Sequence, residues 1–262
     1  METAVEFVWP LPIRVPLHQI LLNAGILHRD INSGNLLVAD NEGIFLDLDL
    51  SVSTKTFPSS SRPPGLTGTW PFISAKLLLD TEIRHEREDD LESFYHVLTW
   101  VALRYTAHNL NPEELSSLME MYDETFCTDS GTKGGRLKSG AFLSGEVPEK
   151  VVFTDCKPLN DLIKELTTVF AVRYRNPEDL EFIRRVKANP YSASVLKQYP
   201  DTDYLQHEEN LAAEKWMVET IRRHLRDRNA WLEADKATPQ ASNSGTMSSR
   251  DHASDQAQQC HN

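Results

Sequence analysis

One long apolar segment, Asp89 to Tyr105, places the strongest constraint on how this chain folds. Its apolar residues recur at helical spacing and cover nearly the whole circumference of a helix. They are Leu91, Phe94, Tyr95, Leu98, Val101 and Ala102. A helix with so broad an apolar surface needs other elements on most sides. The segment therefore predicts a buried central helix.

Further patterns predict helices that could surround it. Asn111 supplies an N-cap, Pro112 a favourable first helical residue, and acidic residues follow, which predicts a helix to about Tyr122. Amphipathic spacing or capping residues predict the other helices, which are Leu17 to Ala24, part of Pro71 to Leu79, Pro158 to Val172, Asn176 to about Ala188, and Glu208 to Ala234. The last is charged with a narrow apolar stripe, and we expect it to pack back on its own domain.

The strand signal is confined to one short region. Leu36 to Ala39 and Ile44 to Leu46 are apolar, and the residues between them suit a tight hairpin turn. Ser51 to Thr69 lacks periodicity and predicts a long loop, and the Gly- and Ser-rich stretch from Thr128 to Gly145 predicts a surface loop. The expected fold class is α+β and predominantly helical.

The chain divides by composition into four parts. Residues 1–14 are short and rich in proline, and residues 15–190 hold the main helical unit with its hairpin. Residues 191–235 form a helical extension. Residues 236–262 contain almost no apolar side chains, which predicts a disordered polar tail.

The overall charge and the apolar runs exclude several classes of protein. The net charge of −12 argues against a nucleic-acid binder, which would need a basic face. The first residues lack the apolar core of a signal peptide, and no run approaches the ~18 apolar residues of a membrane span. We therefore expect an intracellular protein, cytoplasmic or nuclear, without membrane contact.

Three polar residues near the hairpin suggest a chemical site. Asp30 and Asn35 lie in the loop before the hairpin, and Asp47 ends it. An amide oxygen and a carboxylate suit Mg²⁺ that carries a phosphate, and a second carboxylate can accept a hydroxyl proton. This combination is typical of a phosphoryl-transfer site.

Four motifs in order carry a resemblance to a known family. His28-Arg29-Asp30 with Asn35 matches the kinase catalytic loop, and Asp47-Leu48-Asp49 stands where D-F-G is found. Gly68 to Lys76 matches the end of an activation segment, and Asp89-Asp90-Leu91-Glu92-Ser93 matches the start of the central helix. From Val15 to Asn189 the chain resembles the C-terminal lobe of a protein kinase, in particular the fungal-type protein kinase family.

The resemblance implies roles for the site residues. Asp30 would accept the proton of the substrate hydroxyl, Asn35 would hold one Mg²⁺, and Asp47 would bind the Mg²⁺ that bridges the phosphates of ATP. Thr69 corresponds to the threonine that hydrogen-bonds the catalytic aspartate in Ser/Thr kinases.

Three other residues would support this site. The resemblance implies that Asp90 ties down the backbone of the catalytic loop and that His28 packs inward as a structural residue. Arg29 would pair with a phosphorylated activation segment, in which the candidate residues are Thr54, Thr56, Ser59, Ser60 and Ser61.

The sequence also departs from the kinase pattern at three positions. Asn32 replaces a lysine that neutralises the transferring phosphate in many kinases. Asp49 replaces the glycine of D-F-G. Lys76 replaces the glutamate of A-P-E, and because a lysine would repel the arginine partner of that glutamate, we expect the segment to be held less firmly.

The residues before the catalytic loop do not resemble a nucleotide-covering N-lobe. Gly25 is the only glycine among the 27 residues before His28, so neither a glycine-rich loop nor its lysine-bearing strand fits there. We therefore expect a kinase C-lobe that is inactive alone, with ATP and Mg²⁺ binding doubtful, and that self-associates through the uncovered N-lobe-facing surface. The alternatives are a pseudokinase that acts as a binding module for an unknown protein and, less in keeping with the motifs, a kinase-like small-molecule phosphotransferase.

Overall fold

The fold is described from a computed structural model that covers residue 18, residues 20–39, 42–53, 65–189, 203–213 and 215–226, and residue 231. The predicted irregular start at residues 1–14, the polar tail at 236–262, and the five candidate phosphorylation sites lie outside these residues. Within them the protein is predominantly helical with three small antiparallel sheets, as the sequence predicted.

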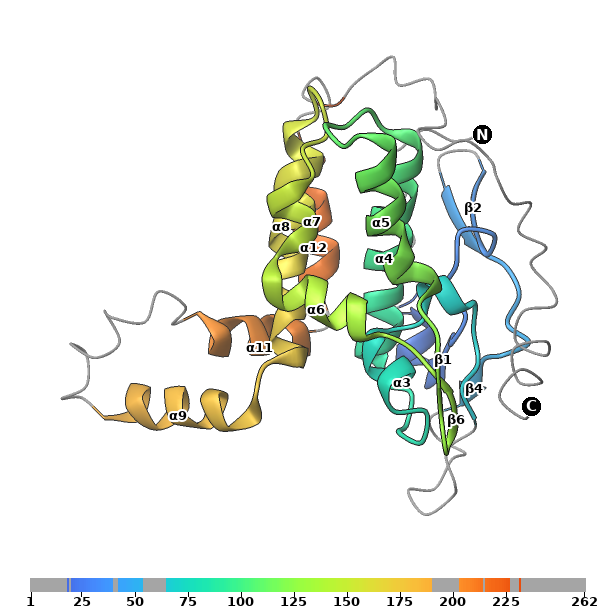
Figure 1. The fold of residues 1–262 in the computed structure, drawn as a ribbon. Coiled ribbons are helices and arrows are strands. Elements are labelled where there is room, and N and C mark those ends of the chain that lie inside the picture. The colour runs from blue at the N-terminus through green and yellow to red at the C-terminus, as the bar shows by residue number, and fades with distance from the viewer. Residues whose placement is uncertain are drawn as a thin grey trace.

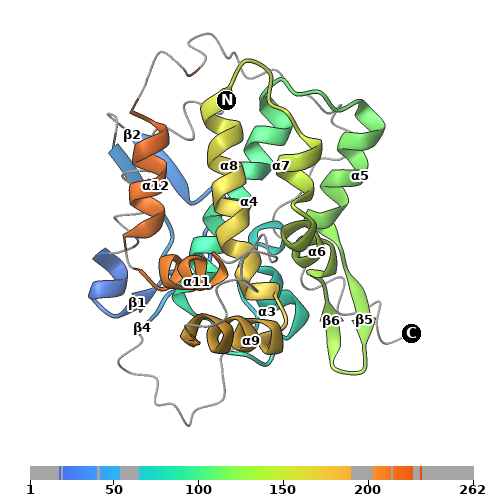
Figure 2. The same ribbon diagram turned by 90° about the vertical axis from the view of Figure 1, so that its left-hand side faces the viewer.

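Helices make up most of the described chain. The α-helices are α3 (Ala75–Leu79), α4 (Arg87–Tyr105), α5 (Pro112–Asp123), α6 (Arg136–Ser144), α7 (Glu146–Lys150), α8 (Lys157–Phe170), α9 (Pro177–Ala188), α11 (Tyr204–Ala212) and α12 (Trp216–His224). Two 3₁₀ turns, η1 (Trp70–Phe72) and η2 (Ala171–Tyr174), join some of them. The long helices α4, α5, α8 and α12 run roughly parallel, and α9 and α11 lie across one end (Figures 1 and 2).

The strands are short and pair in twos. They are β1 (Ile26–Leu27), β2 (Leu36–Ala39), β3 (Glu42–Phe45), β4 (Val52–Ser53), β5 (Phe126–Thr128) and β6 (Gly131–Lys133). β2 pairs with β3 in the predicted hairpin, with Leu36 opposite Phe45. β1 pairs with β4, so the chain after the hairpin returns beside the chain before it.

The prediction of a buried central helix is confirmed by α4. Phe94, Val97 and Leu98 are almost fully buried, and they belong to one core with Leu162 of α8 and Ile221 of α12. Polar atoms on α4 also have partners in this core. The Tyr95 hydroxyl lies 2.8 Å from Thr167 Oγ1, and Thr99 Oγ1 lies 2.7 Å from the Tyr122 hydroxyl.

The prediction of a surface loop from Thr128 to Gly145 is wrong. The chain forms the β5–β6 hairpin and then α6, whose Phe142 is buried against Tyr95 at a ring separation of 4.9 Å. Gly135 and Gly145 bound α6 with left-handed backbone angles, φ 83° and 67°. The glycines that suggested a loop are therefore the caps of a helix.

The predicted helix from Glu208 to Ala234 is two helices, α11 and α12, separated near Ala213. Its predicted apolar stripe is buried in the common core through Leu211, Val218, Ile221 and Leu225. These helices pack on α8, as expected, and Glu165 of α8 accepts a hydrogen bond from His224 at 2.9 Å. Among the described helices none is both long enough and apolar enough to cross a membrane.

Candidate active site

The carboxylate of Asp30 is held from two sides in the loop of residues 28–35. Its Oδ1 accepts hydrogen bonds from the backbone N–H and the hydroxyl of Thr69, at 2.9 and 2.8 Å. Its Oδ2 accepts one from Asn35 Nδ2 at 3.1 Å, and the same Nδ2 lies 3.1 Å from the Asp30 carbonyl oxygen. The structure thus brings together three residues predicted for the site, and it fixes the direction of a carboxylate that remains partly accessible.

Asn32 organises this loop, a role that the sequence did not suggest. Its Oδ1 accepts hydrogen bonds from the N–H groups of Gly34 and Asn35, at 2.8 and 3.0 Å. Its Nδ2 donates to Thr69 Oγ1 at 3.0 Å. An Asn is one of the few residues that can accept and donate in this way from one side chain.

A prediction about Asn32 follows from this division of roles. Asn32→Ala removes the hydrogen bonds to Gly34, Asn35 and Thr69 and should lower the free energy of unfolding by about 1–3 kcal/mol. Asn32→Asp keeps the acceptor oxygen, so backbone amide exchange at Gly34 and Asn35 should accelerate in the Ala variant and much less in the Asp variant. Hydrogen exchange measured by NMR distinguishes the two, with Ser33→Ala as the control. Equal exchange rates in all three variants would contradict the assignment.

Two residues of the site have backbone angles that are rare outside glycine. Arg29 has φ 69° and Asp47 has φ 57°. Such conformations cost about 1–3 kcal/mol each and persist where the surrounding structure imposes them, often at functional sites. Gly68 lies close to Arg29, since a Cβ at position 68 would lie 2.8 Å from the carbonyl oxygen of Arg29. The end of the loop that follows β4 therefore lies directly on the 28–35 loop.

Asp47 lies at the open side of this arrangement. The Leu46 N–H donates to the carbonyl of Asn35 at 3.0 Å, which joins the end of β3 to the 28–35 loop just before Asp47. The Asp47 side chain is exposed, and its Oδ1 accepts the Asp49 N–H at 3.0 Å. Asp49 therefore takes part in the turn after Asp47, a position where D-F-G has glycine.

Asn35 and Asp47 carry amide and carboxylate oxygens of the kind that Mg²⁺ prefers. Asn35 uses its amide nitrogen on Asp30, which leaves its amide oxygen for a ligand. Within the described ranges no group of three His, Cys, Asp or Glu side chains is placed to hold a metal by itself. A Mg²⁺ ion here would therefore need phosphate and water oxygens to complete its coordination.

Asp90 is the buried support of the 28–35 loop. It is 0 % exposed, and four groups donate to it. The backbone N–H groups of His28 and Arg29 lie 3.0 and 3.1 Å from its oxygens, and Nε2 of His18 and of His85 each lie at 2.8 Å. Burial alone would raise the pKa of Asp90, but His85 and His18 hold that pKa well below its usual range.

His28 and Arg29 begin the 28–35 loop, and both are buried. His28 is fully buried, its Nδ1 accepts the Asp30 N–H at 3.3 Å, and burial lowers its pKa although Asp90 opposes the shift. A buried neutral imidazole fits a structural role. The Arg29 guanidinium donates to the carbonyls of Leu50 at 3.4 Å and Gly65 at 3.2 Å. It therefore bridges the two described ends of the activation segment.

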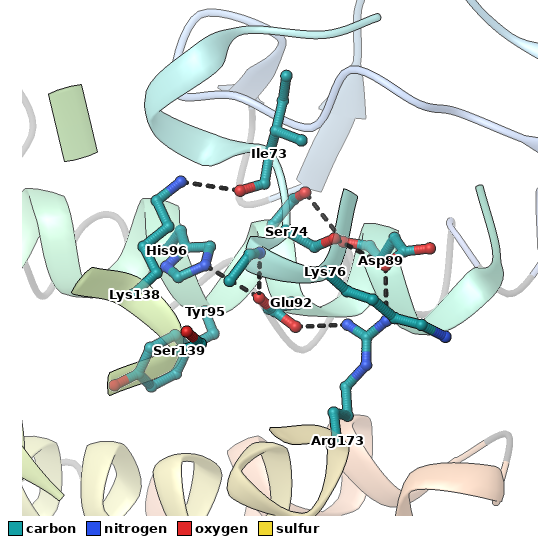
Figure 3. Close-up of polar contacts among 12 residues, drawn as sticks. Ile73, Ser74, Lys76, Asp89, Glu92, Tyr95, His96, Lys138, Ser139 and Arg173 are labelled. Carbon is teal, nitrogen blue, oxygen red and sulfur yellow. Dashed lines mark hydrogen bonds and ion pairs between the residues drawn. The ribbon is translucent and has the colours of Figure 1, made fainter. Parts of the chain in front are cut away.

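Residues other than the Lys76 side chain hold the end of the activation segment. Glu92 of α4 accepts the Ala75 N–H at 2.8 Å, and Ser74 Oγ donates to Asp89 at 2.7 Å. The Lys76 N–H donates to the Tyr174 hydroxyl at 3.2 Å. The Lys76 side chain lies outward and reaches Glu86 at 3.4 Å. The carboxylates that anchor the segment, those of Asp89 and Glu92, therefore lie on the central helix α4 (Figure 3).

Arg173 of η2 completes this anchor. Its Nη2 lies 2.6 Å from Asp89 Oδ1, and its Nη1 is bonded to Glu92 Oε2 and, at 3.1 Å, to the Glu88 carbonyl. Both carboxylates are buried. Burial would raise the pKa of Glu92, but Arg173 first and then His96 lower it to about 2. Arg173 is thus paired with carboxylates of α4.

The sequence reasoning missed several of these supporting residues. Glu92 lies in the Asp89–Ser93 motif, but the resemblance assigned no role to it. His18, His85 and Tyr174 belong to no motif. Their partners lie up to 98 residues away along the chain, as for Tyr174 and Lys76. Only the fold could bring such pairs together.

One comparison with known proteins matches part of the chain to a family. Residues 6–102 match the sequence model of the family described as fungal protein kinase. This stretch contains the 28–35 loop, Asp47, Thr69 and Asp90, so the resemblance inferred from the motifs is confirmed. No curated protein matches the chain.

Proposed function

We propose that this chain carries the catalytic lobe of a Ser/Thr-type protein kinase, because residues 6–102 match the fungal protein kinase family, and that the 262-residue polypeptide alone does not transfer phosphate. The observation that best supports the Ser/Thr type is the double donation from Thr69 to Asp30. It directs a carboxylate toward the open side of the loop, where a substrate hydroxyl could give up its proton.

Each residue of the site would have its own role in the reaction. Asp30 would orient the attacking hydroxyl and accept its proton, and Asn35 and Asp47 would hold the Mg²⁺ that neutralises charge on the ATP phosphates. Asn32 would keep the loop in shape through its hydrogen bonds to Gly34 and Asn35.

Residues 1–27 do not provide the groups that position the nucleotide in a kinase. Residues 1–27 contain one glycine and no lysine, so they supply neither a glycine-rich loop nor a lysine for the phosphates. Because positioning and electrostatic stabilisation provide nearly all catalysis of phosphoryl transfer, the isolated polypeptide should be inactive.

Thermal unfolding tests the proposed weakness of nucleotide binding. We expect no shift of the midpoint with millimolar Mg-ATP, because a ligand stabilises a protein only as far as it binds the native state. A clear rise in the midpoint that Asp47→Ala abolishes would contradict this expectation.

A chimaera tests the proposed catalytic role. It would carry, ahead of His18, the N-lobe of another fungal protein kinase. Phosphate transfer to serine or threonine of a protein substrate should appear in this chimaera and fall to background with Asp30→Asn. A folded chimaera without activity, or one equally active with Asp30→Asn, would overturn the proposal.

We also propose that the surface beside Asp47 mediates self-association. Alternate residues there are apolar and exposed: Ile44 is 42 % exposed, Leu46 39 %, Leu48 45 % and Leu50 38 %. They alternate along the sequence with Phe45, Asp47 and Asp49. Exposed apolar side chains gain free energy when a second surface covers them.

Sedimentation velocity over a range of concentrations measures this association. The average mass of the wild-type protein should rise with concentration, and Leu46→Ser with Leu48→Ser should suppress that rise. The matched control is Leu137→Ser with Leu143→Ser on α6, two leucines that are 45 % and 42 % exposed. A wild-type protein that stays monomeric at high concentration would refute the proposal.

A further inference from the structure

A buried lysine lies under the turn that follows Thr69. Lys138 of α6 is 1 % exposed, and its Nζ donates to the carbonyl oxygen of Ile73 at 2.8 Å and to that of Trp70 at 3.4 Å (Figure 3). In the described part of the chain no carboxylate lies within ion-pair distance of this ammonium. A buried cation held only by neutral carbonyls pays a large desolvation cost. This arrangement therefore needs an explanation beyond packing.

The segment that carries Lys138 is fitted closely to the same turn. The Trp70 indole N–H donates to the Glu124 carbonyl at 3.2 Å, and the Gly134 N–H donates to the Leu78 carbonyl at 3.1 Å. A Cβ at Gly135 would lie 2.6 Å from the Ala75 oxygen. Residues that precede Lys138 thus hold α6 and the β5–β6 hairpin against η1 and α3.

The turn connects Lys138 to Asp30. Phe72 N–H donates to the Thr69 carbonyl at 2.9 Å, and Ile73 N–H donates to the Trp70 carbonyl at 3.3 Å. Thr69 in turn donates twice to Asp30. Any displacement of residues 69–73 would therefore reach the Asp30 carboxylate through a short chain of hydrogen bonds.

We propose that Lys138 is a positioning residue for the 69–73 turn, and that gain or loss of a proton at its Nζ sets how tightly the turn is held. The role of this turn in orienting Asp30 for a substrate rests on the proposed kinase function. The coupling of the turn to Lys138 rests on the contacts alone.

The surroundings of Lys138 decide its charge state. Burial lowers its pKa to about 7, while Glu92, Asp123 and Glu124 oppose that shift. His96 also faces Lys138 from α4, but burial lowers its pKa to about 4. Glu92 has a pKa of about 2. Neither Glu92 nor His96 changes charge near neutral pH. Of Glu92, His96 and Lys138, it is Lys138 whose pKa lies near neutral pH.

The direction of the effect follows from proton linkage. When the turn opens, Lys138 reaches water and its pKa returns toward 10.5, so the open form binds the proton more strongly than the closed form. Above pH 7 the closed turn becomes more stable as pH rises toward 10.5. Below pH 7 both forms carry the proton, and the cost of burying the charge is constant.

Hydrogen exchange of the 262-residue protein tests the proposal without any measurement of kinase activity. After correction for intrinsic exchange, the protection of the Thr69, Phe72 and Ile73 amides should rise about fivefold between pH 7 and pH 8. Lys138→Met should remove this dependence on pH. Lys164→Met, which changes an exposed lysine on α8, should retain it. Wild-type protection that is constant with pH, or equal pH dependence in Lys138→Met, would overturn the proposal.

A second measurement applies if Lys138→Met does not fold. The side-chain ¹³Cε and ¹⁵Nζ resonances of Lys138 in the wild-type protein should titrate with a midpoint near 7. A midpoint above about 9.5, close to that of an ordinary lysine, would overturn the proposal. Both readouts remain valid if the kinase chimaera proves inactive, so the two proposals can fail separately.

Discussion

Asp90→Ala should lower the free energy of unfolding by about 3–5 kcal/mol, because it removes a buried charge partner and leaves donors unsatisfied. The N–H groups of His28 and Arg29 would lose their acceptor, and so would the imidazoles of His18 and His85. These groups are mostly buried and have no room to reach water. Urea denaturation followed by tryptophan fluorescence gives the loss directly.

Two variants separate this effect from a general loss of negative charge. Asp129→Ala changes an exposed aspartate at the tip of the β5–β6 hairpin and should cost less than about 0.5 kcal/mol. Asp90→Asn keeps one oxygen acceptor and should lie between the two. If Asp90→Ala were as stable as Asp129→Ala, Asp90 would not be the support of the 28–35 loop.

Arg173→Met is expected to have a similarly large effect, about 3–5 kcal/mol at pH 7, because it leaves two buried carboxylates without their cation. Asp89 and Glu92 both bind the guanidinium, and Glu92 also holds the Ala75 N–H. Unfolding in urea at a series of pH values measures the loss. Arg185→Met, which breaks an exposed pair with Glu181 one helical turn away, serves as the control and should cost about 0.5 kcal/mol or less.

The effect of Arg173→Met should depend on pH in a defined direction. The folded-state pKa of Glu92 is about 2, below its usual 4.5, so its ionised form stabilises the native protein above pH 4.5 and this contribution is lost as pH falls through 2. Without Arg173 the carboxyl takes up a proton at a higher pH. The stability gap between wild type and variant should therefore narrow below pH 4.5. A gap that stays constant down to pH 3 would exclude Arg173 as the main charge partner of Glu92.

Local patterns were sufficient to predict most of the regular structure. The capping of α5 shows why: Asn111 accepts the N–H groups of Glu113 and Glu114, both at 2.9 Å, as its sequence context indicated. The breadth of the apolar surface likewise predicted the burial of α4. Both signals arise within a few turns of one helix, so neighbours far along the chain do not alter them.

Tertiary packing decided the segments that the sequence did not predict. Gly134 and Gly135 look like loop residues, yet each lies against backbone from elsewhere in the fold, the carbonyls of Glu124 and Ala75. Lys138 looks like a surface lysine and is buried. The contacts of Gly135 with Ala75 and of Lys138 with Trp70 and Ile73 join residues 60, 68 and 65 positions apart, which composition and periodicity do not encode.

The candidate site shows the same division. Asp30, Asn35, Thr69 and Asp90 came from motifs with fixed spacing. The structure joins the first three by hydrogen bonds, and Asp90 accepts the N–H of Arg29 next to Asp30. The sequence shows that the segment has Lys76 where a glutamate is usual. Only the fold shows that Glu92 of α4 binds the segment at the neighbouring Ala75.

The first turns of α4 combine supports that serve different loops. Asp89 binds Ser74 and Arg173, Asp90 holds the 28–35 loop, and Glu92 holds Ala75. Unwinding this helix end would release all of these segments in one event. Substitutions in the 28–35 loop and at Ser74 or Ala75 should therefore be energetically coupled although the segments are separate in sequence. A small shift at the start of one helix could disable the whole site at once, without any ligand or substrate group being touched.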